Sequence, residues 1–373
     1  MTSTTSLVKA THPGAESRLH VAICICTYRR AALLDRLLHA LAEQRLTDPS
    51  PPAITVVVVE NETSGPGEEV CRKHINQSTL TIRYAAEPRP GIPTARNRCL
   101  EIAATFSNFV VFIDDDELPE IDWLEQLLRT QRLTAADVVA GPSRPLFLAP
   151  PPRWLVRSQL YEPRQPPELT RDRKKRAQVS LLRRLLVALF SPLERRSLLP
   201  SGTPIASCST NNVLFNIDVI RSTGLRFEES MADLGYGEDT LFFERIALAN
   251  CRIVWCNEAV VNHLIPHERM AASWLIRREL QQGFCSTRIE ARLGRVRSRR
   301  RVRALLVTLP WALANIIVLP IDLCAGRHRY ILRLARTANI LGRFVAMFDV
   351  SLTYNRRGSC RSASTPIYPA VPN

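Results

Sequence analysis

Three consecutive aspartates, Asp114, Asp115 and Asp116, directly follow the apolar run NFVVFI at 108–113. Adjacent carboxylates repel one another, so such a run is costly unless a positive group joins it. Alternate side chains of an extended segment face the same way, so Asp114 and Asp116 can address one ligand while Asp115 points elsewhere. Carboxylate oxygens suit a hard divalent cation such as Mg²⁺ or Mn²⁺, which often also contacts substrate phosphates. The plain alternative is an acidic turn in which Asp116 or Glu117 caps the next helix.

A second acidic pair, Glu238 and Asp239, stands between Gly237 and the helical run LFFERIALA. Acidic residues are favoured at a helix N-terminus in any protein, which is one explanation of the pair. The other is chemical, because a carboxylate held rigidly near a metal site can act as a general base on a hydroxyl group. The presence of the aspartate triplet in the same chain favours the chemical interpretation.

Polar side chains also follow the other apolar runs of the chain. They are Thr27, Tyr28 and Arg30 after the run 20–26, Glu60 after the run 53–59, and Arg96 and Asn97 after the turn EPRPG at 87–91. Each is weak evidence alone, since a turn with a surface arginine looks the same. Together they place polar groups at the ends of successive strands, as a nucleotide crevice requires.

His263 follows the apolar segment VWCNEAVVN. An isolated histidine is commonly a packing or surface residue. As a neutral imidazole it can instead complete the shell of a metal held by the triplet.

The order of apolar runs predicts the elements that position these residues. Strands are expected at 20–26, 53–59, 80–85, 108–113, 212–217 and 252–263, and helices at 33–41, 95–104, 121–133 and 238–249. Strands that are apolar throughout and alternate with helices indicate a mostly parallel sheet covered on both faces. Ligands bind such sheets at the carboxyl ends of the strands, which is where the aspartate triplet falls.

Charge and hydropathy change character in two segments outside this pattern. The chain of 373 residues is 46% apolar and carries a formal charge of +15, which favours polyanionic partners. Within the insert 150–200, the segment 171–196 has nine Lys and Arg against two acids around an apolar stretch, as in a basic amphipathic helix. The segment 304–321 is 18 residues long, uncharged and flanked by arginines, but Pro310 and Pro320 interrupt it. We interpret it as a re-entrant or interfacial membrane element, with a buried hairpin as the alternative.

The cysteines and the termini bear on the compartment. Ten cysteines lie scattered, several of them in apolar runs, without paired CxxC motifs, which is typical of a reducing compartment such as the cytoplasm. The N-terminal segment 1–19 has no apolar core of a signal peptide, and we expect it and the tail 355–373 to be disordered.

Five segments taken together resemble the family 2 glycosyltransferases, especially those similar to succinoglycan biosynthesis enzymes. They are VAICICTYRR, VVVVENE, EPRPGIPTARN, FVVFIDDDELPEIDWLEQLL and LGYGEDTLFFERIA, which fall in the family's order across residues 20–290. The resemblance implies the Rossmann-like GT-A fold, a nucleoside-diphosphate sugar as donor (UDP-sugar favoured), a divalent metal and inversion at the anomeric carbon.

The resemblance also implies roles for individual residues. Thr27, Tyr28, Arg30, Glu60, Arg96, Asn97, Asp114 and Asp115 would contact the nucleotide sugar; Asp114, Asp116 and His263 would hold the metal; Asp239, beside Glu238, would be the catalytic base. The chain departs from the family at Glu60, where Asp is usual. It also lacks the QxxRW motif of processive synthases, the nearest match being 274–278, so addition of a single sugar is expected.

The sequence thus predicts a GT-A domain at 20–290 that contains the basic insert, and a membrane-associated helical region at 291–354. The predicted function is transfer of a sugar to a lipid-linked saccharide acceptor in cell-surface or exopolysaccharide biosynthesis. We expect this at the cytoplasmic face of the inner membrane, on an anionic lipid surface and without nucleic acid. One alternative is a metal-dependent nucleotidyltransferase, although the glycine-rich loop of such enzymes is absent after the first strand. Another is a basic protein that binds membrane or nucleic acid without catalysis.

Overall fold

The computed structural model describes residues 18–162, 199–295 and 314–348. These residues form two compact units, which we take separately. The first unit holds residues 18–145, 161–162, 199–232 and 238–263, and the second holds 146–160, 233–237, 264–295 and 314–348. The predicted terminal tails, except for 18 and 19, and the basic segment 171–196 lie outside the described residues.

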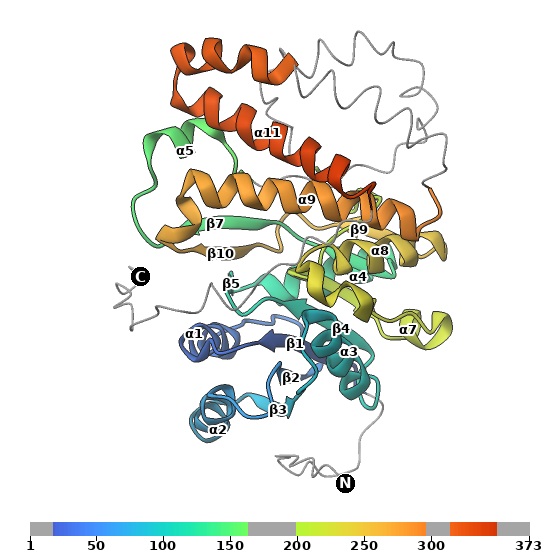
Figure 1. Cartoon of the computed structure of the whole chain (residues 1–373). Coiled ribbons are helices and arrows are strands. Elements are labelled where there is room, and N and C mark those ends of the chain that lie inside the picture. The colour runs from blue at the N-terminus through green and yellow to red at the C-terminus, as the bar shows by residue number, and fades with distance from the viewer. Residues whose placement is uncertain (1–17, 163–198, 296–313, 349–373) are drawn as a thin grey trace. The chain divides into compact units, whose positions relative to one another are not determined.

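A seven-stranded sheet is the centre of the first unit. Its strand order is β3 (Thr81–Ala86), β2 (Ala53–Glu60), β1 (His20–Thr27), β4 (Phe109–Ile113), β8 (Asn212–Asn216), β6 (Val138–Ala140) and β9 (Ile253–Trp255). The first four strands are mutually parallel, β8 is antiparallel to both of its neighbours, and β6 is parallel to β9. The predicted α/β fold with a mostly parallel sheet flanked by helices is confirmed (Figure 1).

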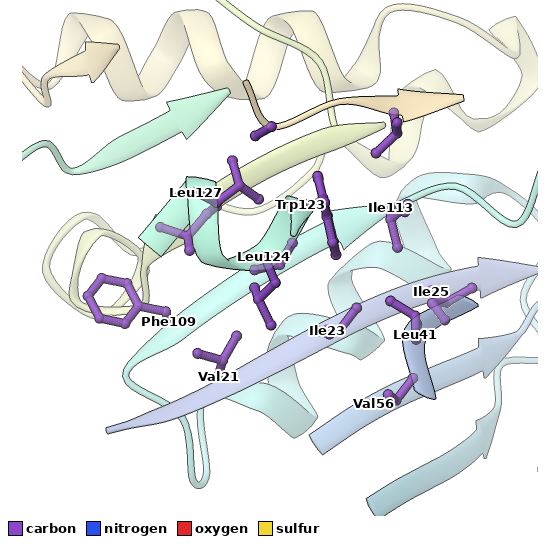
Figure 2. Close-up of a cluster of buried hydrophobic side chains, with 14 of the residues drawn as sticks. Val21, Ile23, Ile25, Leu41, Val56, Phe109, Ile113, Trp123, Leu124 and Leu127 are labelled. Carbon is purple, nitrogen blue, oxygen red and sulfur yellow. The ribbon is translucent and has the colours of Figure 1, made fainter. Parts of the chain in front are cut away.

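Helices cover both faces of this sheet because successive strand residues point to opposite sides. On one face, α1 (Ala31–Ala42), α2 (Gly67–Gln77) and α4 (Trp123–Thr134) bury apolar side chains in one cluster with Val21, Ile23 and Ile25 of β1. Figure 2 shows this core, with Trp123 and Leu127 of α4 among its side chains. Complete burial of side chains of this size contributes about 1.5–3 kcal/mol each.

The opposite face is covered by α3 and α8. Ala22 and Cys24 of β1 contact the apolar side of α3 (Ile92–Ala103), and Phe242 and Phe243 of α8 (Glu238–Leu248) belong to the same cluster. Helix α3 starts at Ile92, next to Pro93 in its first turn, and Gly91 before it adopts φ +116°. A short α7 (Asp218–Thr223) and the 3-10 helix η3 (Glu229–Leu234) connect β8 to α8.

The single strand predicted at 252–263 is wrong, because the chain forms two strands there. Strand β9 ends at Trp255, and a polar turn follows in which the Asn257 backbone N–H donates to Ser201 Oγ at 2.7 Å. The chain then enters a second sheet as β10 (Val261–Ile265), whose strand order is β5 (Glu117–Pro119), β10 and β7 (Ser143–Phe147).

The second unit is mainly helical. It contains α5 (Arg153–Ser158), the 3-10 helix η4 (His267–Met270), α9 (Ala272–Arg292), a helical segment at 314–325 and α11 (Arg327–Val345). Helices α9 and α11 lie side by side (Figure 1). They approach so closely that a Cβ added at Gly283 would lie 1.8 Å from the Asn339 carbonyl oxygen. Among the described residues, none of the helices combines the length and apolar character needed to cross a bilayer. Residues 304–313 of the predicted membrane element are not among those described.

Candidate active site

The carboxyl ends of the parallel strands bring the predicted polar residues of the first unit to one edge of the sheet. Thr27, the last residue of β1, lies in register with Glu60, the last residue of β2. The aspartate triplet follows β4, the other neighbour of β1. Groups more than 80 residues apart in sequence therefore meet at this edge.

Asp115 is buried and held by the turn that follows β1. The Thr27 hydroxyl donates to its Oδ2 at 2.9 Å, and Arg30 Nη1 donates to its Oδ1 at 2.8 Å. Arg29, between these two donors, has φ +54°, a left-handed conformation that an L-residue rarely adopts. Strain of this kind is characteristic of functional turns, and here it accompanies the contacts of Thr27 and Arg30 with one carboxylate.

Arg96 joins the two acidic motifs. It is 4% exposed, and its Nη1 donates to Glu238 Oε1 at 2.6 Å while its Nη2 lies 3.5 Å from Asp114 Oδ1. Burial lowers the pKa of Arg96, but the carboxylates of Glu238, Asp114 and Asp239 outweigh that effect and the net pKa is raised. The guanidinium group is therefore a permanent charge that ties α3 to the start of α8.

Asp116 and His263 are brought together by the second sheet. Strand β10 pairs antiparallel with β5, placing His263 opposite Glu117. The His263 Nε2 lies 3.8 Å from Asp116 Oδ2, and Arg30 Nη1 lies 3.4 Å from the same oxygen. Asp116 thus lies near both His263 and Arg30, and Arg30 also binds Asp115.

The triplet carries more negative charge than its two arginines offset. Burial, followed by repulsion from Asp116, Asp115 and Asp239, raises the pKa of Asp114 to about 6 although Arg96 opposes the shift. Burial also raises the pKa of Asp115 in spite of Arg30. Carboxylates destabilised in this way gain from an added cation, so the donor set fits a hard divalent ion. Within the described residues, the ligand atoms of Asp114, Asp116 and His263 do not all lie within 4.8 Å of one another.

Asp239, the predicted base, lies at the start of α8 beside this charge network. Its Oδ1 accepts a hydrogen bond from the backbone N–H of Thr240 at 2.6 Å. Its charge acts on both Asp114 and Arg96. The half-buried Asp239 carboxylate therefore lies at the start of α8 and interacts electrostatically with Asp114 and Arg96.

Three of the predicted nucleotide-binding residues have other contacts in this structure. Glu60 is buried, and its Oε2 accepts hydrogen bonds from the Gly67 N–H at 3.0 Å and the Tyr84 hydroxyl at 2.8 Å. The Asn97 Nδ2 donates to the Phe227 carbonyl oxygen, and the Phe227 backbone N–H donates to Asn97 Oδ1. Tyr28 is half-buried, and the Arg29 guanidinium lies over the Tyr28 ring, 5.2 Å from the ring centroid. The roles of these residues stay predictions.

Glu117 also lies at this edge, although the sequence did not predict it as a site residue. It is 1% exposed, and its Oε1 accepts from Ser143 Oγ at 2.7 Å and Asn211 Nδ2 at 2.9 Å. Burial, and then the charge of Asp114, raise the pKa of Glu117 well above its usual value. The sequence indicates Glu117 only as the fourth acid in a row, and a helix cap explains a residue in that place equally well.

The fold and the site together define an α/β domain with an acidic centre at the carboxyl edge of its sheet. The model of the family described as "Glycosyl transferase family 2" matches residues 22–185. The chain is also 26% identical over 332 residues to the succinoglycan biosynthesis protein ExoM of Rhizobium meliloti, covering 89% of this chain and 95% of that protein. The segment 22–185 thus matches a family 2 glycosyltransferase domain, and the chain is similar to a succinoglycan biosynthesis protein over most of its length.

A solved structure confirms the fold by likeness. The mannosyltransferase PcManGT of Pyrobaculum calidifontis, solved with GDP-Man and Mn²⁺, superposes with a TM-score of 0.56 at 16% identity, covering 90% of this chain and 88% of that one. The α/β architecture of the chain is thus similar to that of GT-A glycosyltransferases.

We predict that Arg96→Met costs about 3–5 kcal/mol of folding free energy, because it leaves Glu238 buried without its charged partner. Urea unfolding of the metal-free protein measures the loss. The double variant with Glu238→Gln should recover part of it. Arg98→Met, on the same helix but in an exposed pair with Glu101, should cost no more than about 1 kcal/mol. Equal losses for the two arginine variants would contradict the role given to Arg96.

Proposed function

We propose that the chain transfers a sugar from a nucleoside-diphosphate sugar to the hydroxyl group of a saccharide acceptor, with inversion at the anomeric carbon. The supporting observation is that Arg96 draws the aspartate triplet and the Glu238–Asp239 pair into one charge network. Sugar transfer requires a site for the donor diphosphate and a base for the acceptor hydroxyl close together. The network offers the aspartate triplet for the first and Asp239 for the second. The match to a family 2 glycosyltransferase model does not favour the nucleotidyltransferase and the non-catalytic alternatives.

The donor's diphosphate requires positive charge at the carboxylate edge. We propose that Asp114 and Asp116, with His263 beside them, hold Mg²⁺ or Mn²⁺, and that Asp115 with Thr27 and Arg30 faces the nucleotide sugar. One or two carboxylates together with substrate phosphates are a usual shell for these ions. The neighbour from Pyrobaculum calidifontis, which was solved with GDP-Man and Mn²⁺, supports a divalent ion. A UDP-sugar is the donor that we favour.

Asp239 is proposed to act as the general base. The acceptor hydroxyl gives its proton to the Asp239 carboxylate while its oxygen forms a bond to the anomeric carbon. The bond from that carbon to the diphosphate oxygen breaks on the opposite face, and its electron pair leaves with the diphosphate. A divalent ion at the triplet would stabilise that leaving charge as a Lewis acid. Arg96, through Glu238, fixes the start of α8 and so the position of the base.

The acceptor is proposed to be a lipid-linked saccharide at the cytoplasmic face of the inner membrane. The relative from Rhizobium meliloti is named for succinoglycan biosynthesis, which supports an acceptor in the assembly of a polysaccharide. The second unit supports an anionic lipid surface, because its segment 314–325 exposes Ile317 and Ile321 and the nearby α11 carries several arginines. Apolar side chains beside basic ones suit the interface of an acidic bilayer.

Replacing Asp239 by Asn should lower turnover about 10²–10⁴-fold, since general-base catalysis contributes that much. Donor binding should stay unchanged, because the base acts on the acceptor. Steady-state kinetics with a donor titration by calorimetry separates the two effects. Asp218→Asn, which alters an acid in the first turn of α7, is the matched control and should keep full activity. Full turnover by the Asp239 variant would refute the assignment.

A panel of nucleotide sugars, scored for release of nucleoside diphosphate, tests the proposed activity itself. We expect one donor class to be consumed with Mn²⁺ or Mg²⁺ and no release above background with EDTA. Asp114→Asn combined with Asp116→Asn should abolish the metal-dependent release. If release by the intact protein is unaffected by EDTA, the metal part of the proposal fails, and if none of the donors is consumed, the proposed activity fails.

Sedimentation with lipid vesicles tests the membrane proposal. The protein should sediment with vesicles that contain acidic lipid and remain in solution with neutral ones, with binding that weakens as salt increases. Replacing Ile317 and Ile321 by Ser should reduce binding without loss of secondary structure, since both side chains are exposed. Equal binding to acidic and neutral vesicles, or none to either, would contradict it.

A further inference from the structure

Two histidines and an aspartate meet on the surface of the first unit, on helices that the proposed reaction does not use. Asp35 and His39 stand four residues apart on α1, and so share one face of that helix, and His74 lies in the last turn of α2. One ligand atom from each lies within 4.8 Å of the other two.

The contacts inside this cluster resemble those of a preformed ligand set. His74 Nε2 lies 2.9 Å from Asp35 Oδ1, and the rings of His39 and His74 meet edge to face with centroids 4.7 Å apart. The His74 side chain is 3% exposed, whereas Asp35 is half-buried and His39 is exposed. The cluster is therefore fixed at its inner end and open to solvent at its outer end.

We propose that Asp35, His39 and His74 form a binding site for Zn²⁺, separate from the aspartate triplet. Two imidazoles and one carboxylate suit zinc, which takes four ligands and in such three-residue sites keeps a water at the fourth position. Imidazole ligands disfavour Mg²⁺ and Mn²⁺, so the two sites differ in the ions they select. The site rests on the cluster's geometry and is independent of the proposed transferase activity.

Two neighbouring features are compatible with this site. Burial lowers the pKa of His74 although the Asp35 carboxylate opposes the shift, and the neutral imidazole is the form that binds a metal. Lys73 Nζ lies 3.1 Å from Asp35 Oδ1, but Lys73 is 47% exposed and such surface pairs are worth about 0–1 kcal/mol. A bound ion displaces this ammonium group at small cost.

Occupancy would clamp α1 to α2. Helix α1 begins directly after Arg30, which holds Asp115, and α2 begins at Gly67, whose N–H holds Glu60. The ion would thus stiffen the half of the sheet whose loops lead into the proposed nucleotide site. Its direct effect is on stability, because an ion that binds the folded state alone raises the unfolding temperature.

Metal titrations of the chelator-treated protein test the site, with excess Mg²⁺ present to occupy the triplet. We expect the intact protein to bind about one equivalent more Zn²⁺ than His39→Ala or Asp35→Asn, and its melting temperature to rise with Zn²⁺ only when the cluster is intact. Both changes are at solvent-accessible side chains, so the variants should fold. His267→Ala removes another exposed histidine and should leave Zn²⁺ binding unchanged.

Cobalt substitution separates the two sites by their colour, because tetrahedral Co²⁺ with nitrogen ligands absorbs visible light far more strongly than octahedral Co²⁺ with oxygen ligands. The intense band should persist in Asp116→Asn and disappear in His39→Ala. Zn²⁺ stoichiometry and Co²⁺ spectra that are the same in His39→Ala as in the intact protein would overturn the proposal.

Discussion

Burial of several carboxylates at one edge of a sheet is the constraint on which the site depends. Asp115, Asp116 and Glu238 are buried there, and buried carboxylates left without a charged partner would destabilise this edge. Arg96 and Arg30 prevent this by sharing their guanidinium groups among them. Burial raises the pKa of Asp114 to about 6, and repulsion from Asp116, Asp115 and Asp239 adds to this shift although Arg96 opposes it. We propose that a divalent cation, and through it the donor diphosphate, binds at this negatively charged edge.

The fold makes this concentration of charge possible. Parallel strands end at the same edge, so polar residues that follow different strands are brought together without any local relation in sequence. The apolar cores on both sheet faces hold the strand ends in register, and the second sheet adds His263 opposite Glu117. Strain at Arg29 and several buried charges lie at this edge, whereas the central strands behind it are mostly apolar.

Much of the fold followed from sequence because its strands are fully buried and read as continuous apolar runs. The antiparallel direction of β8 did not, since burial on both faces gives either direction the same pattern. Helix α2 was missed because GEEVCRKHINQ is mostly polar and buries only one narrow side. The turn after Trp255 was missed because the apolar run AVV resumes soon after it.

The candidate site was predictable as a set of residue types but less so as a set of contacts. The triplet and Arg96 stood out by their position after strands and turns. That Arg96 bonds Glu238, 142 residues away, leaves no local trace in the sequence. Glu60 occupies the expected strand end, but its side chain turns toward Gly65 and Gly67 at the start of α2. Only glycine leaves room for it there, since a Cβ added at Gly65 would lie 2.2 Å from the Glu60 carboxylate.

The most direct test of this account is the thermodynamic coupling between Mn²⁺ and the nucleoside diphosphate of the preferred donor. If the ion joins the aspartate triplet to the diphosphate, each ligand must raise the affinity for the other by the same factor, about tenfold or more. Calorimetric titrations of each ligand, with and without the other, measure both factors. Equal nucleotide affinity with and without Mn²⁺ would contradict the central role given to the triplet.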